Sequence, residues 1–310
     1  MCPSWRPGGD GELIGRFGRY LHERWISIAT LVLLLLAWEI AGHLSPTSML
    51  RSSPIVPPWE FVFGPALLGM SDYWTFDVLA PVPSLGGEQT WFGATLAIAY
   101  HSAITLLRLL LGFAAGTLGG VLLGLAFSLS SVLRRLAATP LHILRMFPLL
   151  AMVPLFRFWF GANTTAAVAF VAYGVGVVYF AATINAVSNV SPRYIEYART
   201  LGASRLRVYA SVIIPAIAPE LCSSVLLTLG LAWSAVIGAE YIGLDSGMGR
   251  IIIYAQYFSN TGRMTLATLF VILYASISFI FFKRLAARIL IWMPETAFGG
   301  GRAIASRSSR

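Results

Sequence analysis

Several ionisable side chains stand inside or beside long apolar stretches of this sequence, and their types suit the binding or pairing of ions. They are Glu39, Arg108, Arg145, Arg157 and Glu240. A charge in such a setting is costly unless it has a partner or faces a polar path. An arginine can attract an anion, and an arginine and a glutamate at similar depth can pair. The pattern therefore indicates solute contacts or internal ion pairs.

Arg145, Arg108 and Glu240 also have structural alternatives. Arg145 could attract an anion or extend its side chain to the lipid headgroups. Arg157, near the other end of the same stretch, could meet an incoming anion. Arg108 and Glu240 could pair with each other or contact a solute, and these alternatives stay open at the level of sequence.

Two prolines make the stretch with Arg145 and Arg157 the best candidate for the wall of a solute pathway. Pro148 and Pro154 predict bends there, and a bend leaves carbonyl groups that are tolerable only when buried or lining a cavity. Trp233 and Ser234 are weaker candidates, because a lone aromatic residue in an apolar helix usually serves packing.

A polar, basic segment interrupts the apolar sequence between residues 188 and 216. Ser191 can cap a helix whose first position suits Pro192. The pattern predicts that this helix ends at Gly202, a residue suited to a left-handed cap. Ser204 can begin a second helix, and Pro215 is expected to interrupt it. The sequence thus predicts a compact projection that meets a polar partner or lipid headgroups.

Nucleotide hydrolysis and metal chemistry have no basis in this sequence. A P-loop needs Gly-x4-Gly-Lys-Ser/Thr, yet the only lysine is Lys283, which follows Phe282. Cys2 and Cys222 cannot build a disulfide framework or a metal cluster, and the four histidines are dispersed. No cofactor is expected on this chain. If ATP drives its function, ATP and Mg²⁺ bind a partner subunit.

The composition points to a protein of the lipid bilayer. Hydrophobic residues make up 57% of the 310 residues and charged residues only 11%, against about 25% charged residues in a typical soluble domain. The net charge of +9 could suggest nucleic acid, but the basic residues fall at the ends of apolar runs. That distribution is typical of membrane proteins.

Six apolar runs approach the roughly 20 residues that a membrane-spanning helix needs. They are Trp25–Leu44, His101–Ser130, Thr139–Phe160, Asn163–Val187, Pro219–Ile242 and Met264–Phe282.

The basic residues also predict the orientation. Lys and Arg concentrate in the N-terminal tail, in the loops after the second and fourth runs, and in the C-terminal tail, whereas the opposite face has only Arg51, Arg250 and Arg263. Both termini are therefore expected in the cytoplasm. The predicted organisation is a lead (1–24), a first transmembrane helix (25–44), an external segment (45–100), a core with five transmembrane helices (101–290) and a cytoplasmic tail (291–310).

The second run carries a regular series of glycines. Gly112, Gly116, Gly120 and Gly124 recur every four residues and so share one helix face, which lets another helix approach closely. Glycine is also simply common in membrane helices, but four in register favour a packing face.

The loop between the fourth and fifth runs resembles the EAA loop of ATP-binding-cassette importer permeases. The pattern is Glu-Ala-Ala, three residues, Gly, nine residues, then Ile-x-Leu-Pro. This chain has Glu196, Ala198, Gly202, Val212, Ile214 and Pro215 at those places, and Tyr197 replaces the first alanine. The resemblance implies that this loop docks on a separate ATPase through Glu196, Ala198, Arg199, Leu201, Gly202, Ala203 and Ser204.

Residues 50–290 are similar to the nitrate/sulfonate/taurine/bicarbonate branch of these permeases. The matching pieces are Ser53–Pro58, His101–Phe113, Pro140–Leu155, Phe160–Gly161, Leu201–Ser204, Ala239–Glu240 and Gly243–Gly249. The resemblance implies an all-α type I ABC importer permease fold in a bacterial inner membrane. It also implies a second permease copy, an extracytoplasmic binding protein, and alternating access for a small solute, expected to be anionic.

One rival interpretation is a stand-alone channel or gradient-driven carrier whose basic loop binds anionic lipid. A second is a scaffold or an enzyme, but no nucleophile–base set supports an enzyme. The Gly243–Gly249 segment could be a mobile gate or a turn that its glycines permit.

Overall fold

The computed structural model describes residues 10–46, 53–76, 78–241 and 243–289. Every regular element in these ranges is a helix. The predicted tail, residues 291–310, and the first nine residues of the predicted lead lie outside the described residues. In chain order the elements are α1 (Asp10–Leu44), α2 (Trp59–Phe61), η1 (Val62–Ala66), η2 (Gly69–Tyr73), η3 (Pro83–Leu85), α3 (Trp91–Ser128), α4 (Ser131–Met146), α5 (Leu149–Phe160), α6 (Thr164–Asn189), α7 (Pro192–Thr200), α8 (Arg205–Val208), η4 (Tyr209–Ile213), α9 (Ile214–Tyr241), α10 (Met248–Tyr257) and α11 (Thr261–Ile289).

Among the described residues, five helical segments are long and apolar enough to cross a membrane, and a bent pair of shorter helices would make a sixth span. The prediction of an all-helical protein with several membrane spans is confirmed. The five segments are Trp25–Leu44, Trp91–Ser128, Thr164–Asn189, Arg205–Tyr241 and Thr261–Arg288.

The predicted third span, Thr139–Phe160, consists of two helices, α4 and α5, rather than one bent helix, and the pair together would make the sixth span. α4 and α5 meet at an angle of 97°. Phe147 has φ −64° and ψ 123°, an extended conformation that a following proline favours over the helical one, and Pro148 precedes α5. The predicted bend at Pro148 is therefore a sharp break, whereas Pro154 lies inside α5 without ending it.

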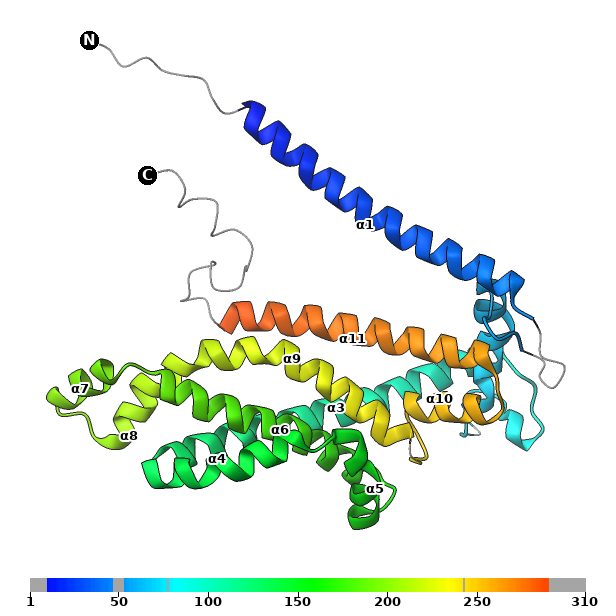
Figure 1. Cartoon of the computed structure of the whole chain (residues 1–310). Coiled ribbons are helices and arrows are strands. Elements are labelled where there is room, and N and C mark those ends of the chain that lie inside the picture. Colours follow the sequence, from blue (N-terminus) through cyan, green and yellow to red (C-terminus); the bar gives the residue numbers. More distant parts are fainter. Residues whose placement is uncertain (1–9, 47–52, 77, 242, 290–310) are drawn as a thin grey trace, which may run out of the picture.

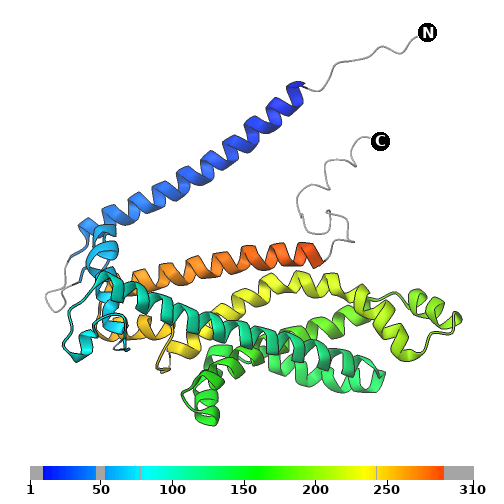
Figure 2. The ribbon, with the colours of Figure 1, turned by 180° about the vertical axis from the view of Figure 1, so that it is seen from behind.

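The central contact of the bundle is the packing of α3 against α6, which run side by side in Figure 1 and in the reverse view of Figure 2. The predicted glycine face of α3 lies in this contact. A Cβ atom added at Gly112, Gly116, Gly120 or Gly124 would lie 2.5–2.6 Å from an atom of α6. Only glycine permits this approach. Gly119, off this face, has nothing within 4 Å of such an atom.

Residues 53–90 cover the end of the bundle opposite α7 and α8 (Figure 1). Asp72 in η2 pairs with Arg263 of α11 at 2.6 Å. Burial raises the pKa of the neighbouring Tyr73 phenol, although Arg263 beside it acts in the other direction. α3 begins at Trp91, ten residues before the predicted apolar run, and Thr90 caps it by accepting a hydrogen bond from the Gly93 amide at 3.0 Å.

α1 projects away from the other helices and touches the protein at its C-terminal end (Figures 1 and 2). It begins at Asp10, so helix occupies part of the predicted lead. Within its apolar stretch Trp25–Leu44, only 6% of the residues are buried. In this contact Glu39 accepts a hydrogen bond from the Trp59 amide at 2.8 Å, and Trp38 stacks on Trp59. Glu39 thus links α1 to the segment 53–90, which covers that end of the bundle.

Candidate functional site

The loop between α6 and α9 folds into the predicted pair of short helices at one end of the molecule (Figure 1). α7 ends at Thr200, and Gly202 adopts a left-handed conformation with φ +77°. The Ala203 amide donates to the Ala198 carbonyl at 3.0 Å and the Gly202 amide to the Arg199 carbonyl at 2.9 Å. These bonds form a Schellman motif, which fixes the turn after α7.

The start and end of the loop differ in detail from the prediction. Ser191 makes no side-chain cap, whereas Ser204 accepts from the Arg207 amide at 3.4 Å. Pro215 does not end the second helix, which corrects that prediction. The chain continues from α8 through one π-helical segment, where the Ile214 amide donates to Tyr209, five residues back. This wider turn accommodates a proline that lacks an amide hydrogen and would crowd a regular helix.

The loop has an inner and an outer face. Ala198 and Ala203 are half-buried against a small core formed by Val208, Ile213 and their neighbours. On the outer face Leu201 is 88% exposed and Leu206 80% exposed. The other predicted coupling residues, Glu196, Arg199, Gly202 and Ser204, are also exposed.

Hydrogen bonds tie the base of the loop to the end of α3. The Tyr209 hydroxyl donates to the Ser128 carbonyl at 2.9 Å. Arg205 donates to the Leu129 carbonyl. The projection is therefore attached both to α9, with which it is continuous, and to the central helix α3.

A buried ion pair lies at the other end of the bundle. Arg108 Nη1 donates to Glu240 Oε1 at 2.9 Å, and the two side chains are 3% and 0% exposed. The Thr105 hydroxyl lies 2.9 Å from the carboxylate and the Gly249 amide donates to it at 3.0 Å. The predicted pairing of Arg108 with Glu240 is confirmed, while a role of Glu240 in a solute pathway stays a prediction.

The same network holds the segment Gly243–Gly249. Arg108 donates to the Ser246 carbonyl at 2.7 Å, and the Gly247 amide donates to Nδ1 of His101 at 2.9 Å. Gly243 and Gly247 have φ values of +114° and +110°. A Cβ atom at Gly247 would lie 2.2 Å from the Glu240 carboxyl carbon. In this conformation the segment is a turn anchored to α3, and a role as a mobile gate stays a prediction.

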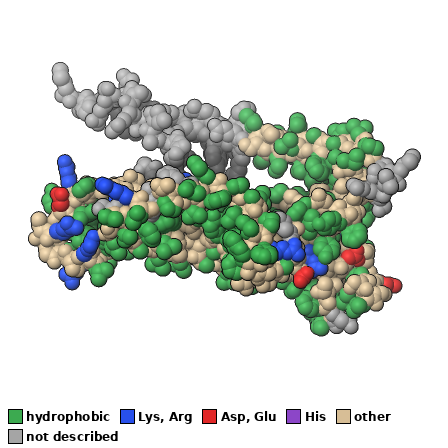
Figure 3. Space-filling model, turned by 60° about the horizontal axis from the view of Figure 1, so that its bottom comes forward, with side chains coloured by type: hydrophobic (Ala, Val, Ile, Leu, Met, Phe, Trp, Pro, Cys, Tyr) green, Lys and Arg blue, Asp and Glu red, His purple; other side chains and the backbone are tan. Residues whose placement is uncertain are grey.

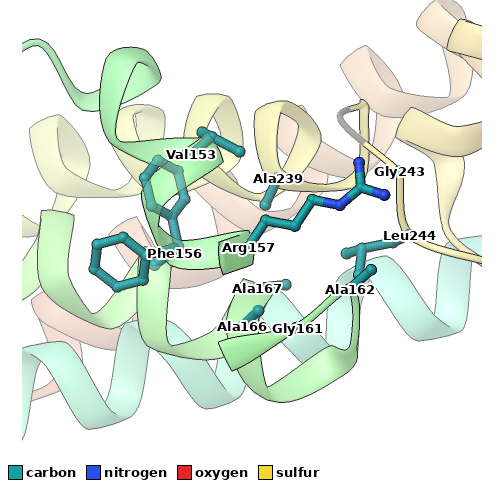
Figure 4. Close-up of a pocket in the computed structure, with 11 residues that line it drawn as sticks. Val153, Phe156, Arg157, Gly161, Ala162, Ala166, Ala167, Ala239, Gly243 and Leu244 are labelled. Carbon is teal, nitrogen blue, oxygen red and sulfur yellow. The ribbon is translucent and has the colours of Figure 1, made fainter. Parts of the chain in front are cut away.

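Arg157 extends from α5 across a small pocket towards the turn at Gly243 (Figure 4). The other residues that line this pocket are small or apolar: Val153, Phe156, Gly161, Ala162, Ala166, Ala167, Phe170, Ala239 and Leu244. The cavity volume is about 20 Å³, room for about one water molecule. In this conformation the pocket is too small for a solute, so contact between Arg157 and a solute requires that α5 or the turn move.

The remaining pathway candidates lie in different settings. Trp233 is 5% exposed in the main core and donates to Ser278 at 2.9 Å. Ser234 is exposed, and its hydroxyl donates to the Gly230 carbonyl of its own helix at 3.1 Å. Pro148 is exposed at the α4–α5 break. Arg145 is exposed and lines a groove with Arg134 and Arg135.

Sequence reasoning missed part of the buried network. His101 and Thr105 precede Arg108 by seven and three positions, which places all three on one face of α3. His101 is 2% exposed, and its other ring nitrogen lies 3.1 Å from the Tyr73 carbonyl. A polar stripe in an otherwise apolar helix was the signal that could have found them.

The described residues form a helical membrane protein with a polar projection between α6 and α9. Residues 116–291 match the family described as binding-protein-dependent transport system inner membrane component, and the chain belongs to that family of ABC transporter permeases.

Two relatives come from Escherichia coli (strain K12). The taurine transport system permease protein TauC is 28% identical over 284 residues, which cover 89% of this chain and 95% of the relative. The putative aliphatic sulfonates transport permease protein SsuC is 31% identical over 224 residues, which cover 71% of this chain and 84% of the relative.

Solved ABC transporters share the fold. A bacterial transporter involved in the import of the acidic polysaccharide alginate matches with a TM-score of 0.52 and 13% identity, covering 88% of this chain and 99% of that one. An amino acid ABC transporter crystallised with histidines matches with a TM-score of 0.50 and 21% identity, covering 62% and 92%.

Proposed function

We propose that this chain is the membrane permease of an ATP-driven importer that moves a small sulfonate-like anion into the cytoplasm by alternating access. The observation that carries the proposal is the projection formed by α7 and α8. It is rigidly capped, continuous with α9, and exposes Leu201 and Leu206. Large apolar side chains at the tip of a charged loop support a protein partner, because burying them there would stabilise a complex.

The partner in this proposal is an ATPase subunit that binds ATP and Mg²⁺ and receives residues 196–204. Movement of the ATPase would displace the projection as a rigid body and tilt α9, which changes the free-energy balance between inward and outward access. The bonds from Tyr209 and Arg205 to the end of α3 would carry the same displacement to the central helix.

The proposed orientation places the projection and both termini in the cytoplasm. The start of α1 and the end of α11 lie on the same side of the molecule as α7 and α8 (Figure 1). Basic side chains gather at that end in the space-filling view of Figure 3. This distribution supports a cytoplasmic position. The opposite end, covered by residues 53–90, would then receive the binding protein.

The proposed solute class follows from the relatives, whose names refer to taurine and aliphatic sulfonates. Arg145 and Arg157 are the arginines of the α4–α5 region that would meet such an anion. We also propose that two copies of the chain form the permease. The apolar surface of α1, of which so little is buried within one chain, supports a further packing partner.

Substitutions at Gly202 test the coupling role. We expect Gly202→Val to abolish co-purification of the ATPase and solute uptake, because a β-branched residue is strained by about 1–2 kcal/mol or more in the left-handed conformation. Gly202→Asn is the matched control, since asparagine tolerates that conformation and the site has open space around it.

Co-expression with the ATPase from the same transport system, followed by affinity purification and uptake of labelled solute, measures both quantities. Unchanged docking and uptake in Gly202→Val would refute the coupling assignment. Gradient-driven uptake by the purified chain without ATP would instead favour a stand-alone carrier.

A further inference from the structure

Three arginines of α4 line one groove beside α6, and no acidic side chain lines it among the residues that the structure describes. They are Arg134, Arg135 and Arg145. Leu141 from α4 and Ala181, Ile184 and Asn185 from α6 complete the lining. The groove has a volume of about 320 Å³, within the range of sites that hold small ligands.

The spacing along α4 explains the groove. Arg134, Leu141 and Arg145 are separated by seven and four positions, so they share one helix face. Leu141 is buried against Ala181 and Ile184 and forms an apolar floor. Along α4, Arg134 and Arg135 precede this apolar floor and Arg145 follows it, so basic positions flank it on both sides.

The three guanidinium groups have few acceptors. Arg134 donates to the Ser188 hydroxyl at 3.2 Å and to the Ser128 carbonyl at 3.4 Å. Its Nε–H is buried and has no acceptor in the part of the chain that the structure describes. Among the described residues, neither Arg135 nor Arg145 has a hydrogen-bond or salt-bridge partner.

We propose that this groove binds a tetrahedral oxyanion, either a sulfonate or a phosphate group. Like charges around one concave site repel each other, and an anion between them removes that repulsion. The planar guanidinium fork matches the oxygens of such groups. Two sources have this chemistry: a free alkanesulfonate and the phosphate of a lipid headgroup. Only the first source rests on the proposed function.

The test uses the full-length chain in lipid nanodiscs and follows its thermal unfolding midpoint. One arm adds ethanesulfonate to discs of phosphatidylcholine alone. The other arm replaces part of the phosphatidylcholine with phosphatidylglycerol and adds no solute. The variant Arg135→Gln/Arg145→Gln removes two lining charges and keeps Arg134. Lys283→Gln/Arg284→Gln is the control, because it removes two charges from exposed positions of α11.

We expect the native chain and the control to be stabilised in at least one arm, and the groove variant to lose at least tenfold in apparent affinity or most of the shift there. A response to ethanesulfonate identifies the free anion, and a response to phosphatidylglycerol identifies the lipid. Arg145→Lys keeps the charge but loses the fork, so an intermediate response is expected. No shift of the native chain in either arm, or equal shifts in variant and control, would overturn the proposal.

The outcome is separable from that of the proposed function. The groove variant leaves the projection intact, so it is expected to co-purify with the ATPase as the native chain does. Unchanged docking and uptake in Gly202→Val would refute the coupling assignment, and gradient-driven uptake without ATP would remove the importer assignment. Either result leaves the binding data for the groove in place.

Discussion

Glu240 has no exposed surface, so its carboxylate depends entirely on donors from α3 and α10. The guanidinium group of Arg108 donates hydrogen bonds to Glu240, Ser246 and Thr164. Breaking such a pair from one side leaves the other charge buried without compensation, which is more costly than replacing both. The pair holds α3, α9 and the turn before α10 in one arrangement.

A double-mutant cycle tests this arrangement at the residue scale. We expect Arg108→Met and Glu240→Leu each to lower the free energy of unfolding by about 3 kcal/mol, and the double variant to lose clearly less than the sum. Denaturant unfolding in detergent measures these values. Ser234→Ala is the control, with an expected change of less than about 0.5 kcal/mol. Strictly additive losses would show that the two side chains do not act as a pair.

This network also shows what the sequence could and could not reveal. The charges of Arg108 and Glu240 were visible in apolar runs, and their pairing was one of two alternatives. The Ser246 carbonyl and the Gly247 and Gly249 amides carried no signal, because backbone groups contribute only once the turn is folded. The folded turn brings the Ser246 carbonyl to Arg108, the Gly247 amide to His101 and the Gly249 amide to the Glu240 carboxylate.

At the scale of elements, the closest approach in the bundle depends on which face of α3 carries glycine. Gly116 and Gly119 lie in the same helix, but a Cβ atom at Gly116 would lie 2.6 Å from the Ala172 carbonyl oxygen, whereas one at Gly119 would meet nothing within 4 Å. Backbone cannot move aside as a flexible side chain can. The two positions therefore separate packing from helix propensity.

We expect Gly116→Ala to destabilise the protein by about 1–3 kcal/mol through overpacking. Gly119→Ala is expected to leave stability unchanged or raise it by about 0.5–1 kcal/mol, because alanine favours the helix. Thermal unfolding of both variants in detergent provides the comparison. If the two variants behaved alike, α3 and α6 would not be in close contact in the membrane protein.

The length of the apolar runs predicted which helices could cross the membrane, but it did not predict how these helices begin, break or join. The Thr90 cap starts α3 ten residues before the predicted position. Pro148 breaks the third run by 97° whereas Pro215 is absorbed by a π-helical turn. A proline removes one hydrogen bond in either case, and the surrounding packing decides whether the helix ends.

At the scale of the whole molecule, the exposed leucines have different surroundings. Leu201 is 88% exposed at the tip of the projection, and Leu227 is 76% exposed along α9, inside the segment long enough to span the membrane. Lipid can cover Leu227. In the proposed function, the ATPase subunit covers Leu201.

We expect Leu201→Ala to reduce ATPase co-purification at least tenfold while leaving the unfolding midpoint of the isolated chain unchanged. Leu227→Ala is the matched control and is expected to retain the ATPase. Affinity purification from co-expressing cells at several salt concentrations measures the effect. Equal retention of the ATPase by both variants would argue against an apolar contact at the loop tip.

The helical segment Arg205–Tyr241 has a mechanical consequence. Its 37 residues correspond to roughly 55 Å at 1.5 Å per residue, so in the proposed function the segment would act as a lever arm between the projection and Glu240. A tilt of about 5° around one end would shift the other by roughly 5 Å, about one helical turn of travel. The π-helical turn at Tyr209–Ile213 lies close to the projection, so bending there would act over nearly the whole length of the segment and lose the most displacement at the distant end.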